Sequence, residues 1–156
     1  MALTFAAMVK FCAGLKMSAY FVISAYNPQA SIDDQIDASS LADQLQINWV
    51  DYRHALINDW PAISFNHQPD WALEWMLEPA GMLGRLWHAG HSLEHQVAGS
   101  LTAAFIAWHR KYIDLRYPLY LFRPPQRVCL ELVGSTSLTT IQTWLDQSLD
   151  HYRRGA

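Results

Sequence analysis

The part of the sequence best suited to bind a metal is WHAGHSLEH, residues 87–95. It holds three of the chain's seven histidines, His88, His91 and His95, and one glutamate, Glu94. On a helix, His91 and His95 would lie one turn apart on the same face, where two imidazoles can share a Zn²⁺ at about 2.0–2.1 Å. His88 would fall on that face too, and Glu94 beside it could take a proton from metal-bound water. A helix here would therefore suit zinc-dependent hydrolysis.

This geometry depends on a helix, and the local sequence does not favour one. In a strand, His91 and His95 would be roughly 13 Å apart at about 3.3 Å per residue, too far for one ion to bridge. Gly90 and Gly99 confine any helix to about eight residues, and glycine weakens a helix by about 1 kcal/mol relative to alanine. A non-catalytic metal site and a pH-sensitive site remain alternative interpretations of these histidines. Histidines that are solvated or hydrogen-bonded in a loop fit the sequence better.

The pattern H-x-x-E-H at 91–95 resembles the signature of the inverted zinc proteases. The resemblance implies that His91 and His95 bind Zn²⁺ and that Glu94 is the general base. In that family a third ligand is an acid on a helix well downstream, whereas the only later glutamate here, Glu131, falls in a predicted strand. The resemblance covers five of 156 residues. A zinc-dependent hydrolase is therefore the alternative interpretation, and zinc is its cofactor.

Other catalytic motifs are missing from the sequence. It contains no nucleophile elbow, Walker loop or dinucleotide-binding fingerprint. Charged residues make up only 16% of the chain, which also has seven tryptophans, so some aromatic area could be exposed for a partner. We therefore expect a non-catalytic protein-interaction domain, of an adaptor or immunity-like kind, that needs no cofactor and binds another protein or itself.

Two tryptophans and two arginines are the residues expected to bind this partner: Trp71, Trp75, Arg123 and Arg127. Tryptophan and arginine are enriched among residues that dominate interface energies. Arg123 and Arg127 flank a Pro-Pro turn, where two guanidinium groups could receive a carboxylate or phosphate. The alternatives are that both tryptophans belong to the core and that the turn is simply solvated.

Charge, cysteine content and hydropathy limit which partners and which cellular compartment fit the sequence. A net charge of −3 with few lysines disfavours nucleic acid. Two cysteines, Cys12 and Cys129, are too few for a disulfide framework and fit a reducing cytoplasm. No uncharged apolar run approaches the roughly 18–20 residues that span a bilayer, so no membrane partner is expected. Residues 1–16 are interpreted as a non-native or disordered extension upstream of Met17, with a cleaved signal peptide as the alternative, and residues 17–156 as one domain.

The residue patterns predict about three helices and five or six strands. Aromatic and β-branched runs predict strands within 18–26, 62–65, 71–78, 119–122 and 127–133. Helical spacing of apolar residues predicts helices over 40–47, from 100 to before 117, and from 138 onwards. Within 71–78, Trp71 and Trp75 would share one buried face and leave Glu74 and Glu78 in water. Together these elements predict a single α+β domain: a mostly antiparallel sheet of five or six strands with about three helices packed on one face.

Overall fold

The computed structural model describes residues 20–30, 41–78, 81–88, 92–96 and 100–155. Within them the chain forms, in order, β1 (Tyr20–Ser24), α3 (Leu41–Gln44), α4 (Trp49–Asp59), β2 (Ile63–Asn66), β3 (Leu73–Leu77), β4 (Met82–Leu86), β5 (Ser92–Gln96), α5 (Ser100–Tyr112), β6 (Leu119–Phe122), β7 (Cys129–Leu132) and α6 (Leu138–Gly155). The predicted α+β class is confirmed. No helix in these ranges is long and apolar enough to cross a membrane.

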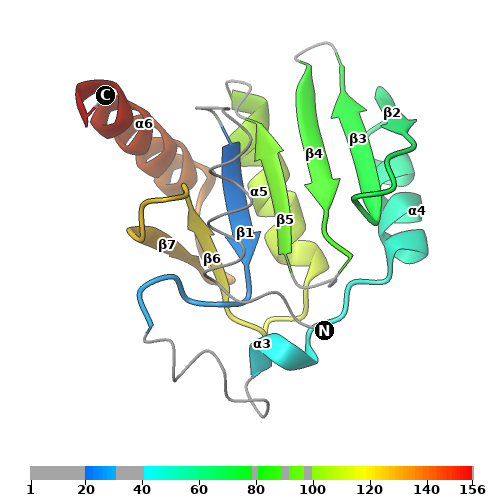
Figure 1. Cartoon of the computed structure of the whole chain (residues 1–156), viewed down its shortest axis with the longest axis horizontal. Coiled ribbons are helices and arrows are strands. Elements are labelled where there is room, and N and C mark those ends of the chain that lie inside the picture. Colours follow the sequence, from blue (N-terminus) through cyan, green and yellow to red (C-terminus); the bar gives the residue numbers. More distant parts are fainter. Residues whose placement is uncertain (1–19, 31–40, 79–80, 89–91, 97–99, 156) are drawn as a thin grey trace.

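The strands form one antiparallel sheet in the order β2-β3-β4-β5-β1-β6-β7 (Figure 1). The sheet therefore has seven strands in the described residues, not five or six, because β4 and β5 come from a stretch without a predicted element. β1 lies inside the sheet, between β5 and β6, and all five of its residues are buried. Its aromatic and β-branched sequence, YFVIS, suits a strand that is covered on both faces.

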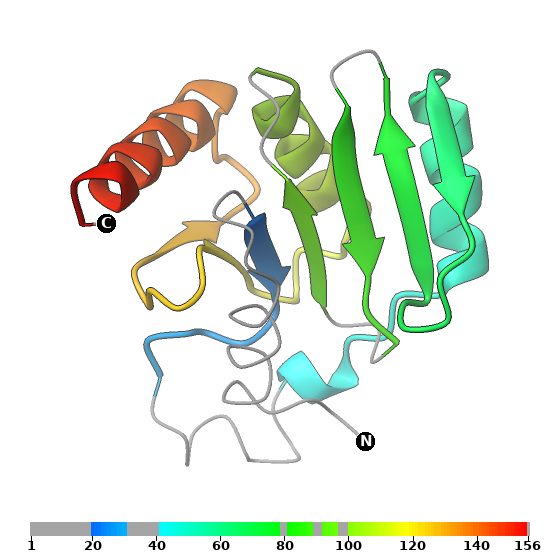
Figure 2. The same cartoon turned by 45° about the horizontal axis from the view of Figure 1, so that its top comes forward.

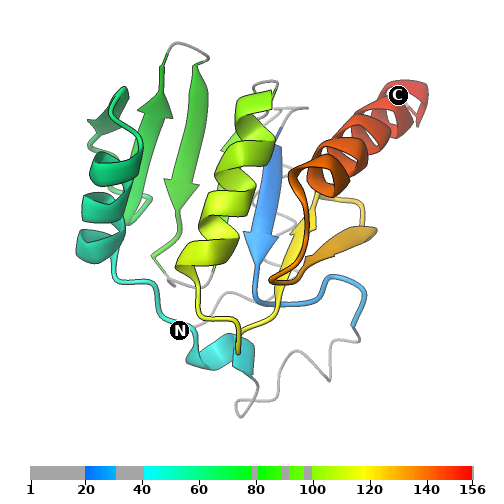
Figure 3. The same ribbon diagram turned by 180° about the vertical axis from the view of Figure 1, so that it is seen from behind.

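Three helices cover one face of the sheet. Figure 3 shows α4, α5 and α6 side by side in front of the strands, with α3 near one end of the sheet. Two of the predicted helices are α5 and α6. The helix predicted over 40–47 is only the four residues of α3, and α4 was not predicted. A Tyr26 hydroxyl that donates to the Asp43 carboxylate ties α3 to the end of β1.

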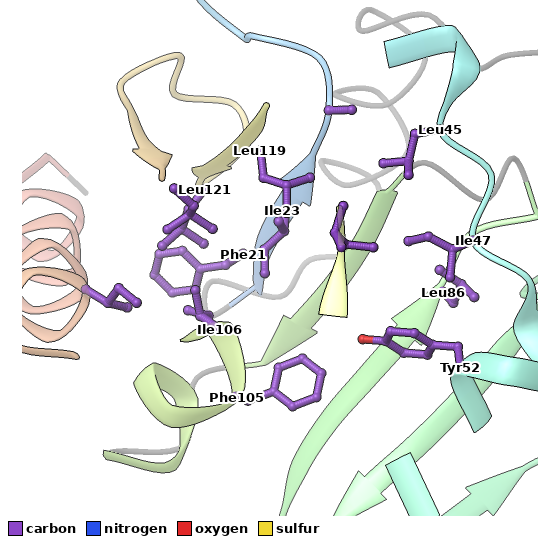
Figure 4. Close-up of a cluster of buried hydrophobic side chains, with 14 of the residues drawn as sticks. Phe21, Ile23, Leu45, Ile47, Tyr52, Leu86, Phe105, Ile106, Leu119 and Leu121 are labelled. Atoms are coloured by element: carbon purple, nitrogen blue, oxygen red, sulfur yellow. The ribbon is translucent and has the colours of Figure 1, made fainter. Parts of the chain in front are cut away.

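Apolar side chains pack on both faces of the sheet. Phe21 and Ile23 of β1 join the larger cluster under the helices (Figure 4), whereas Val22 between them points to the other face because strand residues alternate. The smaller cluster there consists of Val22, Trp71, Trp87 and Phe122. Trp75 is completely buried under the helices. The prediction that Trp71 and Trp75 share one face of the sheet is therefore wrong, since Trp71 precedes β3 rather than belonging to it.

The position of α4 is fixed by contacts with α5 inside an aromatic cluster. The Tyr52 hydroxyl lies 2.9 Å from His109 Nδ1, and both side chains are buried. Burial, with a smaller contribution from Tyr112, raises the pKa of the Tyr52 hydroxyl well above its ordinary value, so the hydroxyl keeps its proton. Trp108 Nε1 also donates to Asp59 Oδ2 at 2.6 Å. These contacts hold both ends of α4 in place.

Gly84 leaves the space that Trp75 fills. The two residues are partners across β3 and β4, and a Cβ at position 84 would lie 2.3 Å from Trp75 Cε2. We expect Gly84→Ala to lower the free energy of unfolding by about 1–3 kcal/mol, since an overpacked core must shift. Urea denaturation measures this loss.

Gly134→Ala is the matched control for that substitution. Its Cβ would meet the side chain of Leu115 at 3.2 Å, and Leu115 is exposed and free to move aside. We expect a smaller loss than at position 84. If Gly84→Ala is as stable as the unsubstituted chain, the packing argument is wrong.

Candidate binding cleft

A cleft of about 580 Å³ opens at one end of the sheet. Its walls are the end of β2 and the β2–β3 connection, the start of β3, the end of β4, and the first turns of α4. Figure 2 shows these segments meeting at the edge of the molecule. We call it the indole cleft because three tryptophans line it, together with an arginine and two histidines: Trp49, Trp71, Trp87, Arg53, His67 and His88.

The α4 wall is set by a helix cap. The Asn48 side chain accepts hydrogen bonds from the backbone N–H groups of Val50, at 3.0 Å, and Asp51, at 3.1 Å, which starts the helix at Trp49. Trp49 and Arg53 are then one turn apart and are neighbours on the helix surface. Trp49 is 51% exposed, so a large apolar ring stands at the rim of the cleft in contact with water.

Arg53 is held against an aromatic ring but has no acidic partner. Its guanidinium carbon lies 4.6 Å from the centroid of Phe65 on β2, close enough for a cation–π contact. Among the residues that the structure describes, Arg53 makes no ion pair and no side-chain hydrogen bond. The side chain is therefore positioned while its N–H donors are left for a ligand or for water.

An ion pair forms part of the wall on the opposite side. Glu74 is buried, and its Oε2 accepts from Arg85 Nε at 2.7 Å. This corrects the prediction that Glu74 is in water; Glu78 is exposed, as expected. The Arg85 guanidinium in turn lies 4.9 Å from the Trp71 ring centroid. Because a buried carboxylate needs a charged partner, Glu74 holds Arg85 against the Trp71 ring, and its carboxylate is already paired where it lines the cleft.

The remaining side chains complete the wall. Trp71 and Trp87 pack with their ring centroids 6.4 Å apart, a spacing typical of aromatic pairs. His88 Nε2 lies 2.9 Å from the carbonyl oxygen of Pro69, which can only accept, so Nε2 carries the proton. This bond holds the β2–β3 connection against the end of β4. The cleft therefore combines aromatic surfaces with one arginine that has no ion pair, and its only lining acid is paired with Arg85.

The structure does not form the helix that the zinc interpretation requires. Residues 92–96, with Glu94 and His95, are strand β5, paired with β1 and β4. His91 lies outside the described residues, and His88 lines the indole cleft instead. Among the residues described, no group of three or more histidine, cysteine, aspartate or glutamate side chains could hold a metal ion.

The predicted partner-binding residues are mostly buried. Trp75, Arg123 and Trp71 have exposed fractions of 0%, 3% and 8%, and only Arg127 is exposed. The four residues therefore do not form one exposed surface, and both tryptophans belong to core clusters, as in the alternative. The Arg123 guanidinium lies 5.6 Å from the Phe21 ring centroid and does not share an exposed turn with Arg127.

Two residues of the cleft, Trp49 and Arg53, were missed because α4 was missed. The signal that could have found them is Asn48 as a helix cap, followed by Trp49 and Arg53 at a spacing of four. Comparison of the chain with models of known protein families, with curated proteins and with solved structures gives no significant match. The interpretation of the cleft therefore depends on its own geometry.

Proposed function

We propose that this protein is a non-catalytic binding domain whose indole cleft receives part of a partner protein. The observation that carries the proposal is Trp49, a half-exposed tryptophan at the rim of a concave site, one helical turn from Arg53. Tryptophan and arginine are enriched among the few residues that dominate the binding energy of protein interfaces. The cysteine content favours a reducing cytoplasm as the compartment of this interaction.

Exposed apolar residues beyond the cleft favour a protein over a small molecule. Val50 and Ile57 of α4 are each 41% exposed, and their spacing of seven places them on one side of the helix. With Trp49 they extend the apolar surface along α4, outside the volume that a small ligand would fill. A protein partner can cover the cleft and this side of α4 together.

The acid in the cleft wall supports binding rather than catalysis. A general acid or base must exchange a proton with a substrate at hydrogen-bond distance. The Glu74 carboxylate is instead buried in an ion pair with Arg85 at 2.7 Å. Its role is then to stiffen the wall that presents Trp71.

Substitution of Trp49 tests the proposal. We expect Trp49→Ser to weaken binding of the partner at least tenfold, because truncating an interface tryptophan typically costs 2 kcal/mol or more. The partner is first captured from cells with the tagged, unsubstituted chain, and its dissociation constant is then measured for each variant. Circular dichroism checks that the variants stay folded.

Leu115→Ser is the control, since Leu115 is 67% exposed and lies in the connection between α5 and β6, away from the cleft residues. Binding should be unchanged in this variant. Equal affinities of the unsubstituted chain and Trp49→Ser would count against the indole cleft as the binding site.

A further inference from the structure

We infer that the bound segment carries a carboxylate side chain that pairs with Arg53, next to an apolar side chain that packs on Trp49. This inference rests on the proposed function and adds the chemistry of the partner. The first observation that supports it is that the Arg53 side chain has no ion pair and no hydrogen bond among the described residues. A guanidinium offers five N–H donors in a planar fork that matches a carboxylate, and none of them is used by a described residue.

The Phe65 ring prepares Arg53 for such a partner. Stacking at 4.6 Å restricts the guanidinium plane, so less side-chain entropy is lost when a carboxylate binds. The contrast with Arg85 is informative, because that arginine lies over Trp71 in the same way and has its carboxylate, Glu74, at 2.7 Å. Arg53 has the aromatic support without the acid, and a partner can supply the acid.

The charges around the cleft also favour an acidic ligand. Among the described residues that line the cleft, Arg53 is a cation without an ion pair, and the only acid, Glu74, is paired with Arg85. Asp51, two positions from both Trp49 and Arg53, and Asp70, between Pro69 and Trp71, are exposed but do not line the cleft. Neither forms an ion pair with Arg53.

The spacing on α4 predicts the spacing in the ligand. Side chains four apart on a helix have their Cβ atoms about 5–6 Å apart. In an extended segment, side chains two apart lie on one face and about 6.6 Å apart. A ligand that contacts Trp49 and Arg53 together should therefore carry its apolar and acidic residues at positions i and i+2.

Two synthetic peptides that differ in one group test the inference. Both are acetylated and amidated; one has the sequence GSLSEGS and the other GSLSQGS, so that only the carboxylate is lost. Binding to the ¹⁵N-labelled, full-length chain is followed by NMR, with the backbone signals of α4 and the Trp49 indole signal as reporters. We expect saturable shifts with the acidic peptide and at least tenfold weaker binding of the amide peptide.

Matched variants of the protein assign the preference to one arginine. Arg53→Gln should bind the two peptides equally, whereas Arg127→Gln, which removes an exposed arginine outside the cleft, should keep the tenfold preference.

The inference is overturned if the unsubstituted chain shows no saturable shifts with the acidic peptide, if it binds both peptides equally, or if Arg53→Gln keeps the preference. Inorganic phosphate that matches the acidic peptide in affinity would also overturn it. The Trp49→Ser binding measurement decides the proposed function separately, so failure of one can be told from failure of the other.

Discussion

Arg110→Met is expected to lower the free energy of unfolding by about 3–5 kcal/mol, the largest effect that we predict for one side chain. Arg110 is buried, and its guanidinium donates to the carbonyl oxygens of Ile113, Asp114, Tyr117 and Leu132 at 2.9–3.2 Å. It thus joins the end of α5 to strand β7. A hydrogen bond to a charged group contributes about 1.5–3 kcal/mol, and a buried acceptor left without a donor adds a desolvation cost.

The charge of Arg110 is maintained in spite of its burial. Burial lowers the pKa of the guanidinium, an effect that Asp114 partly offsets. The ordinary pKa of arginine is so high that the group still keeps its proton near neutral pH. Chemical denaturation of Arg110→Met measures the effect. Lys111→Met is the control, because Lys111 is the exposed neighbour on α5 and surface substitutions usually change stability by less than about 0.5 kcal/mol. Equal stabilities of the two variants would refute the argument.

The second large effect is expected at the Glu74–Arg85 ion pair. Arg85→Met should lower the free energy of unfolding by about 3 kcal/mol, because it leaves the Glu74 carboxylate buried without its partner. We expect the lower end of the range that is usual when a buried ion pair is broken, because the Arg85 side chain is still 18% exposed. The double variant Glu74→Met with Arg85→Met should be more stable than Arg85→Met alone, because two apolar side chains of similar length replace the pair.

Urea denaturation of both single variants, the double variant and the unsubstituted chain completes a double-mutant cycle. A double variant that is less stable than Arg85→Met would contradict the interpretation of Glu74 as a residue whose burial depends on Arg85. The cycle also bears on the indole cleft, because Arg85 supports Trp71 at 4.9 Å. Loss of Arg85 should therefore disturb the NMR signal of the Trp71 indole, and loss of an exposed arginine such as Arg127 should not.

Elements with a strong local pattern could be predicted from the sequence. The strand predicted over 119–122 is β6, and the helices predicted from 100 and from 138 are α5 and α6. The strand is a short continuous run of apolar and aromatic residues, and the two helices repeat their apolar residues at helical spacing. α4 lacks such a pattern, because only Tyr52 and Leu56 of its eleven residues are buried. It is held by tertiary contacts with α5, which the local sequence does not show.

The remaining errors come from interactions between strands. Gly84 resembles a breaker of regular structure, yet it lies within β4 because the Trp75 indole covers it. Glu74 resembles a solvent-facing acid in an alternating strand, yet its opposite residue in the register is Arg85. The register cannot be read from one strand alone. For the same reason, the indole cleft could not be predicted, since three separate segments of the chain form it.

The position of β1 inside the sheet has a consequence for synthesis on the ribosome. Val22 pairs with Glu94 on one side and with Phe122 on the other, a hundred positions further along the chain. Such distant pairing slows folding, because loop-closure entropy must be overcome before the contacts form. During translation, the edge of β1 that pairs with β6 therefore stays unpaired and exposed to chaperones or to aggregation until the polypeptide beyond Phe122 has left the exit tunnel.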